Sequence, residues 1–214
     1  SGGGENSTFS TSLGYLDQTG MTIYSDYKRY NFRVNSSYKK GIFSLSENIA
    51  ITHRDKTPTT AFNISLPTLP IYDSEGRFFS GGGDYYINPE DGKAQNKIAP
   101  LHYTDRYNKV TDIIGAITAQ LDLWDGLKYK FSFSGNYSNS HNYTHTPEYY
   151  TKWNEDGTPD QDYGSPKNSI SESRGEEFTY TIDNLLTYNK TFSGHSIDAL
   201  VGTSSVSYTH LTLP

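Results

Sequence analysis

The chain has 214 residues and a formal net charge of -6, and only 33% of its residues are hydrophobic while 14% are aromatic. Its 19 tyrosines stand against a single methionine. A water-soluble core is rarely built mainly from tyrosine, whereas a membrane interface or a glycan-binding face suits this ring. The sequence has no apolar run long enough for a transmembrane helix. The lack of cysteine excludes disulfides and thiolate metal sites, and the acidic balance offers no basic surface for nucleic acid.

Alternation of apolar and polar residues is the dominant pattern, and it is clearest in residues 127–138. Phe131 and Phe133 share one face of this segment, while Ser132 and Ser134 share the other. At about 3.3 Å per residue the segment spans roughly 40 Å. With a strand tilt of about 40°, that length crosses the apolar band of an outer-membrane barrel, which is about 25 Å tall.

Seven segments in chain order carry this alternation and are predicted to be strands. They are residues 8–16, 28–38, 42–54, 109–123, 127–138, 176–188 and 195–205. Glu47 and Asn184 interrupt the apolar rows of the third and the sixth segment. A charge that faces lipid costs on the order of a few kcal/mol at most. A bulge or a switch of parity is therefore predicted at these two positions in place of exposure to lipid.

The connections between the segments alternate between short and long. Short turns are predicted at residues 39–41, 124–126 and 189–194, and longer loops at 17–27, 55–108 and 139–175. Outer-membrane barrels show this pattern because their periplasmic turns are short and their outward loops are long. The sequence therefore predicts an all-β fold, an antiparallel up-and-down meander that forms a partial wall of a large transmembrane β-barrel, with its first strand running outward.

Three stretches resemble the SusC/RagA family of TonB-linked outer-membrane transporters. SLGYLDQTG running into SDYKRYNFRVN (residues 12–35) resembles the first barrel hairpin of that family, and LPIYDSEG (69–76) and DNLLTYNKTFSGHSIDALVGTS (183–204) support the match. The resemblance spans most of residues 1–205 but a minority of a family chain, which would also carry a plug domain and many more strands. It implies TonB-driven uptake of oligosaccharides or peptides across the Gram-negative outer membrane, with a SusD-like lipoprotein lid on the outer face.

The last residues, VSYTHLTLP (206–214), look like translated adapter sequence, so the native part of the barrel is predicted to end at residue 205. The alternative is that these residues continue the seventh strand, because Val206, Tyr208 and Leu211 could extend it with their threonine neighbours.

Tyr149, Tyr150 and Trp153 in TPEYYTKW are the candidate contacts for a substrate or a lid, because they fall in a long outward loop and could stack on a sugar ring. The alternative, which the sequence favours, is an aromatic girdle at the outer membrane interface. No catalytic residue, cofactor site or metal site is predicted. His141 and His145 are expected to be surface residues of a loop, since no cysteine or clear carboxylate partner accompanies them.

Two other interpretations remain open. A soluble or surface-bound β-sandwich that binds glycans would need a strand break within residues 127–138 and long loops at both ends, and a non-transporting adhesin barrel would differ in lacking a plug. Seven strands leave two open edges, whose unpaired backbone groups cannot be satisfied in lipid. The chain is therefore expected to be a fragment that cannot work alone, an open curved meander with little order in its loops and no closed lumen.

Overall fold

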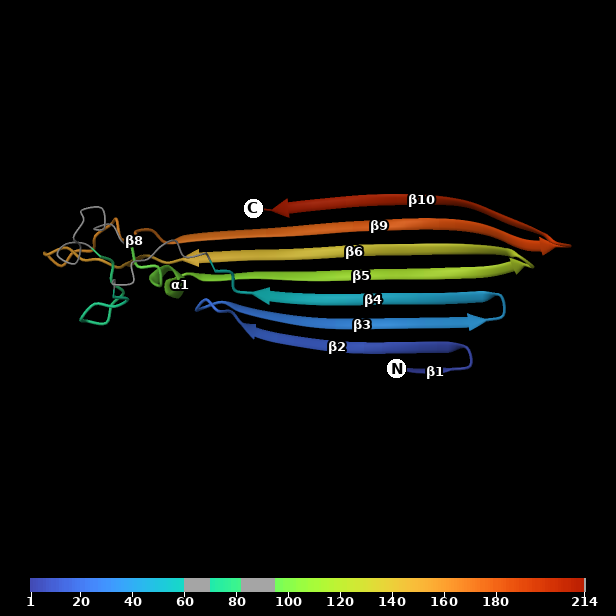
Figure 1. The fold of residues 1–214 in the computed structure, drawn as a ribbon. Coiled ribbons are helices and arrows are strands. Elements are labelled where there is room, and N and C mark those ends of the chain that lie inside the picture. The colour runs from blue at the N-terminus through green and yellow to red at the C-terminus, as the bar shows by residue number, and fades with distance from the viewer. Residues whose placement is uncertain (60–69, 82–94, 214) are drawn as a thin grey trace.

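The computed structural model describes residues 1–59, 70–81 and 95–213, and it is almost entirely an antiparallel β-structure (Figure 1). Eight strands form one open sheet in the order β1-β2-β3-β4-β5-β6-β9-β10. Their bounds are Gly2–Gly4, Ser7–Thr19, Asp26–Lys40, Phe43–Lys56, Asp105–Trp124, Leu127–Thr146, Ser169–Phe192 and His195–Leu213. The short strands β7 (Tyr149–Tyr150) and β8 (Gly164–Ser165) pair with each other, and the helix α1 (Ala99–Tyr103) precedes β5. Within the described residues, no helix is long and apolar enough to cross a membrane.

All seven predicted strands are confirmed, and several run further than the sequence indicates. The largest differences lie where β6 continues to Thr146 and β9 begins at Ser169, which shortens the predicted loop of residues 139–175 to residues 147–168. His141 and His145 therefore belong to a strand, and their prediction as loop residues is wrong. Alternation fades in these extensions because both faces are polar, while the backbone pairing continues.

Directly paired residues point to the same side of the sheet. The alternation in neighbouring strands therefore adds up to one apolar face and one polar face. On the apolar face, Ile117 lies beside Phe133, which in turn lies beside Ile182. On the polar face, Thr118 lies beside Ser132, and the two hydroxyl oxygens are 3.3 Å apart. The predicted parity of residues 127–138 is thus kept across three neighbouring strands.

The apolar face forms a band of limited height. In β5 the band runs from Leu121 to Ile113, a rise of eight residues that corresponds to about 20 Å after correction for a tilt of about 40°. Towards the loop end, the band is bordered by Tyr15 and Tyr30, whose ring centroids are 5.1 Å apart. Charged residues such as Lys109 follow on the same face. This height is close to the apolar band of outer-membrane barrels, about 25 Å.

The two polar residues in the apolar rows do not disturb the sheet. Pairing is unbroken across Glu47 and Asn184, so the predicted bulge or parity switch is wrong. Ser36 Oγ donates a hydrogen bond to Glu47 Oε2 at 2.9 Å, and the Tyr129 hydroxyl donates one to Asn184 Oδ1 at 2.7 Å. Each group finds a partner on the apolar face itself. Between β5 and β6 the register shifts instead at residues 122–124, beside a short turn.

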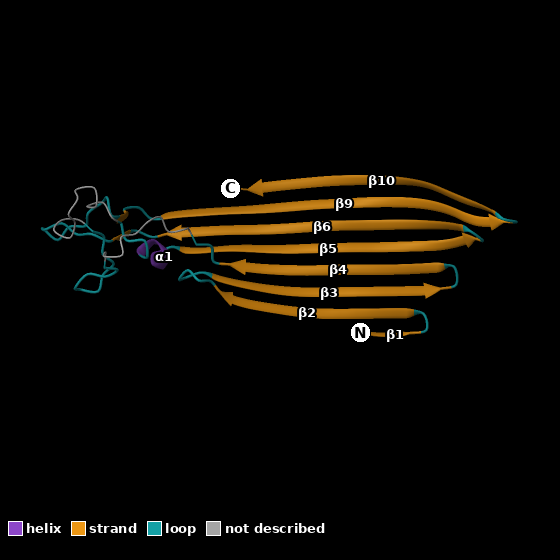
Figure 2. Ribbon diagram, in the orientation of Figure 1, coloured by secondary structure: helices purple, strands orange, loops and turns teal. Residues whose placement is uncertain are grey.

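The short turns gather at one end of the sheet and the long loops at the other, as predicted (Figure 2). Gly126, at the tip of the β5–β6 turn, has φ of 84°, and a Cβ there would lie 2.4 Å from the Asn189 carbonyl oxygen, so only glycine fits. The turns are staggered: Phe43 starts β4 opposite Leu121, before β5 ends, and each later hairpin reaches further out (Figure 1). Tilted strands in a barrel wall require such a stagger.

The buried residues of the described chain lie in the loops and not in the sheet. Phe78, Ala99, Leu101 and Tyr163 are at most 8% exposed, whereas the sheet is a single layer with neither face covered. The described parts of the loops thus pack against one another, and the expectation of little order in the loops stays a prediction. The features required of a β-sandwich are also missing from the described residues, because β6 has no break and no second sheet packs on the first.

The two ends of the sheet add details that the alternation did not reveal. Gly2–Gly4 forms β1, which pairs with β2 although glycines carry no hydrophobic signal. Residues 206–213 continue β10, with Leu213 opposite Arg174, so their conformation follows the alternative of strand continuation. Their resemblance to adapter sequence stays a prediction about their origin.

Candidate functional site: the polar face and the outer loop cluster

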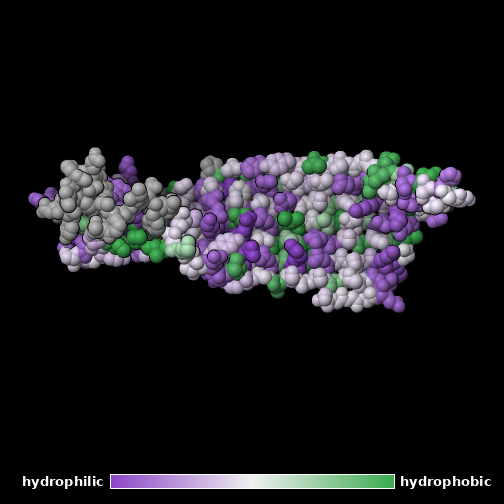
Figure 3. Space-filling model, viewed as in Figure 1, coloured by the Kyte–Doolittle hydropathy of each residue, from purple (hydrophilic) through white to green (hydrophobic). Residues whose placement is uncertain are grey.

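The polar face of the sheet presents hydroxyl, amide and charged groups that hydrogen-bond across the strands. Asn35 Nδ2 donates to Ser10 Oγ at 3.2 Å, and Asn48 Nδ2 donates to Asn35 Oδ1. Closer to the loops, Thr52 Oγ1 donates to Asn31 Oδ1 at 3.2 Å. Figure 3 shows one face of the sheet, on which hydrophilic residues cover most of the strands and hydrophobic residues are scattered. A face of this composition suits contact with water or with a polar solute.

An ion pair joins two strands on the polar face. Arg54 Nη2 of β4 donates to Asp112 Oδ2 of β5, and Ser138 Oγ of β6 donates to Asp112 Oδ1 at 2.8 Å. The Arg54 side chain remains 41% exposed, so the pair is accessible from solvent. Exposed ion pairs contribute little to stability, which leaves the guanidinium group available for other contacts.

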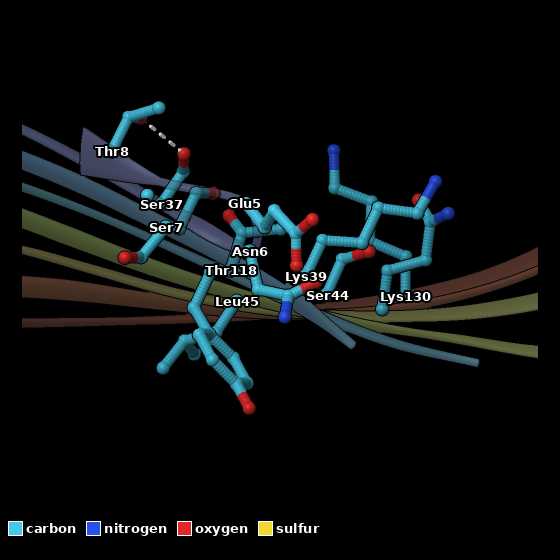
Figure 4. A pocket seen from close by; sticks show the side chains of 14 residues that line it. Glu5, Asn6, Ser7, Thr8, Ser37, Lys39, Ser44, Leu45, Thr118 and Lys130 are labelled. Atoms are coloured by element: carbon cyan, nitrogen blue, oxygen red, sulfur yellow. Dashed lines mark hydrogen bonds between the residues drawn. The ribbon is translucent and has the colours of Figure 1, made fainter. Parts of the chain in front are cut away.

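Near the short turns, the polar face is hollowed to a volume of about 460 Å³ (Figure 4). Hydroxyl groups and the ammonium groups of Lys39 and Lys130 line this hollow, and Thr8 and Ser37 share a hydrogen bond of 2.6 Å at its edge. Leu45 points to the opposite side of the sheet in the same view. The hollow therefore belongs to the polar face, at the end remote from the long loops.

At the other end of the sheet, the described loop residues 70–81, 95–104 and 147–168 pack into an outer loop cluster. Asn96, only 5% exposed, organises it. Its Nδ2 donates to the carbonyl oxygens of Ile71 and Phe79 at 2.8 and 2.9 Å, and its Oδ1 accepts two backbone N–H groups at the start of α1. Asn96 N in turn donates to Ser80 Oγ at 2.8 Å. One buried side chain thus ties three parts of the loop together.

The two long loops are joined through Ser80 and Thr151. Ser80 N donates to the Thr151 carbonyl oxygen at 2.7 Å, and the two side-chain hydroxyls are 2.6 Å apart. Thr151 N donates to the Tyr163 carbonyl oxygen at 2.9 Å. Ser80 is fully buried and Thr151 is 3% exposed. The loop before β5 and the loop before β9 therefore form a single packed unit.

Two tight hairpins of matching geometry project from the cluster. Asp73 N donates to the Arg77 carbonyl oxygen, and Asn154 N donates to the Thr158 carbonyl oxygen, both at 2.8 Å, and each turn contains a glycine with φ close to 80°. Burial alone would raise the pKa of the Asp73 carboxyl, but the backbone N–H and guanidinium groups of Arg77, together with Glu75 N–H, hold that pKa below its usual value. The first turn therefore keeps its charged acceptor in mild acid.

Tyr149, Tyr150 and Trp153 all lie in this cluster. Tyr149 stacks on Tyr103, with ring centroids 4.7 Å apart, and burial and then Tyr103 raise the pKa of its hydroxyl. The Tyr150 hydroxyl donates to Glu148 Oε1 at 2.9 Å, which raises the pKa of Tyr150, and its ring meets Trp153 edge-on at 6.4 Å. The structure brings the three predicted residues together, with Tyr149 engaged in packing.

Of these three predicted residues, Trp153 has the most exposed ring. It is 38% exposed, and the Arg77 guanidinium of the other long loop lies 5.1 Å from its ring centroid. The rings that border the apolar band are Tyr15 and Tyr30, whereas Trp153 belongs to the loop between β7 and β8, where it forms a β-bridge with Pro159. The girdle interpretation of these loop rings and their contact with a substrate or a lid both stay predictions.

The two histidines considered as metal ligands each have another partner. His141 Nε2 lies 2.7 Å from Glu172 Oε1, and His145 Nε2 lies 2.8 Å from Asn168 Oδ1. In the described part of the chain, no group of three or more histidine, aspartate or glutamate side chains could hold a metal ion. The carboxylate partner of His141 comes from β9, far along the chain, which is why the sequence did not indicate it.

Sequence reasoning missed the role of Asn96, for which a local signal exists. Asn96 precedes Pro100 at the first turn of α1, and an asparagine shortly before such a proline is typical of a helix start. Its bonds to Ile71 and Phe79 involve residues distant in sequence and could not be predicted in this way.

No protein-family model and no curated protein matches this sequence. Among solved structures, the chain is similar to a chain of the RagAB peptide importer in its "closed-closed" state, with a TM-score of 0.73, 16% identity and coverage of 97% of this chain and 23% of that one. A second structure of the RagAB peptide transporter matches with the same TM-score and identity, over 99% of this chain and 24% of that chain. The chain thus spans about a quarter of the chains it matches, and it has a distant SusC/RagA-like fold.

Proposed function

We propose that this chain forms part of the barrel wall of a TonB-driven importer of the SusC/RagA family in the Gram-negative outer membrane. The importer takes up oligosaccharides or peptides, and a SusD-like lipoprotein covers its outer face. The wall itself carries no catalysis. The observation that supports this most strongly is a single-layer sheet whose apolar face forms a band about 20 Å tall, with a polar face behind it.

The energetics of the two faces favour a bilayer over water. Large apolar side chains are exposed on the apolar face, among them Leu13 at 82% and Phe9 at 55%. Each buried apolar side chain contributes roughly 1.5 to 3 kcal/mol when it leaves water. Lipid covers the band without a second protein layer, and the polar face then lines an aqueous lumen.

The outer loop cluster is placed where a substrate or lid arrives. It lies beyond the end of the sheet that carries the long loops, and it holds the partly exposed Trp153. The matched importer structures are named for a complex, RagAB, that imports peptides, which supports a peptide as one class of nutrient and a second protein as partner.

Uptake by cells tests the function. We expect a strain that expresses the full-length parent protein to accumulate a labelled oligopeptide or oligosaccharide, and to lose accumulation when TonB is deleted. Deletion of the adjacent lid protein should weaken uptake at low nutrient concentration. Unchanged accumulation without TonB, or recovery of the parent protein in the soluble fraction, contradicts the proposal.

A further inference from the structure

Four basic residues cluster on the polar face next to the outer loops. Arg29 and Arg33 come from β3, and Arg54 and Lys56 come from β4. Arg29 is paired directly with Arg54, which places their Cβ atoms about 5 Å apart. We call these four residues the arginine patch. The neighbouring carboxylate on the same face is Asp112, which binds Arg54.

The acidic residues of β2 and β4 lie on the opposite face. Asp17 is paired with Lys28, which is paired with Asp55, and Glu47 is paired with Ser36, so the three carboxylates share the apolar side. The chain as a whole has more acidic than basic residues, 24 against 18. The positive charge of the patch is therefore a matter of placement and does not follow from composition.

The patch leaves two guanidinium groups without partners. Among the described residues, the guanidinium groups of Arg29 and Arg33 make no hydrogen bond and no ion pair, and both residues are exposed. Arg54 Nε, although buried, also has no described hydrogen-bond partner. Like charges directly opposite each other destabilise a sheet, so the arrangement costs stability unless an anion binds there.

We infer that the arginine patch binds the carboxylates of an acidic peptide as it enters from the outer loops. This inference rests on the proposed function, since it makes the polar face the inner wall. An arginine fork matches a carboxylate with two parallel hydrogen bonds. Arg29 and Arg33 are four residues apart on one face, with Asn31 between them, a separation of about 13 Å. Carboxylates of residues i and i+4 in an extended peptide have the same spacing.

The surroundings of the patch favour a peptide over a sugar. Asn31 and Thr52 lie between the basic residues and offer both donors and acceptors to peptide amides. The pairing places a single aromatic ring, Tyr27, on the polar face of β2, β3, β4, β5 and β6. A sugar that binds by stacking finds one platform there, whereas a chain of carboxylates finds several cations.

Binding to the full-length parent transporter in detergent tests the inference. The probe is a fluorescent octapeptide of alternating Glu and Ala, compared with its Gln and Ala counterpart and with an oligouronide. We expect the acidic peptide to bind at least tenfold more tightly than the neutral peptide. The double variant Arg29→Gln, Arg33→Gln should remove most of this preference, and added salt should weaken it.

The matched control is the double variant Lys28→Gln, Lys109→Gln. It removes the same charge from the apolar face, at the height of Arg29, so the preference for the acidic peptide should persist. Equal binding of both peptides, an equal loss in the control, or tight binding of the oligouronide alone overturns the inference. So does a lower melting temperature of the arginine variant with unchanged preference, which means that the patch pairs with another part of the parent chain.

Failure of the inference and failure of the proposed function give different results. Import of the neutral peptide without any preference for the acidic one rejects the arginine patch and leaves the importer intact. Absence of import for peptides and oligosaccharides alike rejects the proposed function, and the inference with it.

Discussion

Within each strand, the odd or even position of a residue decides which face of the sheet its side chain points to. Neighbours in sequence such as Phe131 and Ser132 face opposite sides, and their cross-strand partners Ala119 and Thr118 repeat the contrast. The polar Asn184, opposite Phe131, is accommodated because Tyr129 donates a hydrogen bond to it. A change of one position along the strand therefore exchanges the apolar face for the polar face.

Charge introduced on the apolar face should impair assembly more than charge on the polar face. In the full-length parent, Phe131→Arg places a guanidinium against lipid at a cost of about 2 to 4 kcal/mol near mid-depth, whereas Ser132→Arg places it in the lumen. A heat-modifiability gel of outer membranes should show much less folded protein for Phe131→Arg. Equal amounts of folded protein for the two variants contradict the assignment of the faces.

Loss of the Asn96 side chain should loosen the outer loop cluster. Asn96→Ala removes the acceptor of the Ile98 and Ala99 backbone N–H groups at the start of α1, and a buried unsatisfied group costs about 1 to 3 kcal/mol. Hydrogen exchange of the Ser80 amide should become faster. The neighbouring Gln95→Ala, which removes an exposed bond of 3.4 Å, is the control, and equal protection in the two variants rejects the role of Asn96.

At the level of the elements, the sequence predicts the strands that cross the band but not their full length. Alternation marks a strand only where one face is apolar, so residues 139–146 of β6 gave no signal although they pair with β9 throughout. The hairpin parity was predictable because a tight turn fixes the register of the two strands that it joins. The unbroken pairing at Glu47 was not, since it depends on Ser36 in another strand.

The candidate site was predictable in position but not in contacts. Tyr149, Tyr150 and Trp153 were predicted to lie in a long loop from their position between strands, and they lie between β6 and β9 at the end of the sheet that carries the long loops. Their partners Tyr103 and Arg77 lie in the other long loop, and no local pattern connects two loops so distant in sequence. The arginine-rich second strand was visible in the sequence, but the sorting of charge between faces required the register.

The sidedness of the connections predicts which of them a protease reaches from outside. Gly157 and Gly41 both lie in turns where a Cβ would meet nothing within 4 Å, so both turns have room for an inserted protease site. In intact cells that express the full-length parent, the site inserted at Gly157 should be cut and the site at Gly41 should be spared until lysis. Cutting at Gly41 alone reverses the topology.

At the scale of the whole molecule, the described sheet has one layer, two faces of opposite character and two open edges, β1 and β10. The hydrophobic cover that a soluble protein builds from a second layer is missing from the described residues. The band on the apolar face and the charged rows beyond it divide the sheet into a zone with one apolar face and a zone with charged residues on both faces. The division predicts a pattern of solvent access that a soluble protein would not show.

Spin labels along β6 test this division most directly. The chain contains no cysteine, so single cysteines at successive positions of residues 127–146 can be labelled without background from this segment. In the full-length parent in lipid, collisions with oxygen should peak at odd positions between 129 and 137, and collisions with a water-soluble nickel complex should peak at even positions. From residue 139 onward both faces should become accessible to nickel. Equal access of nickel to odd and even positions throughout β6 contradicts a membrane-spanning wall.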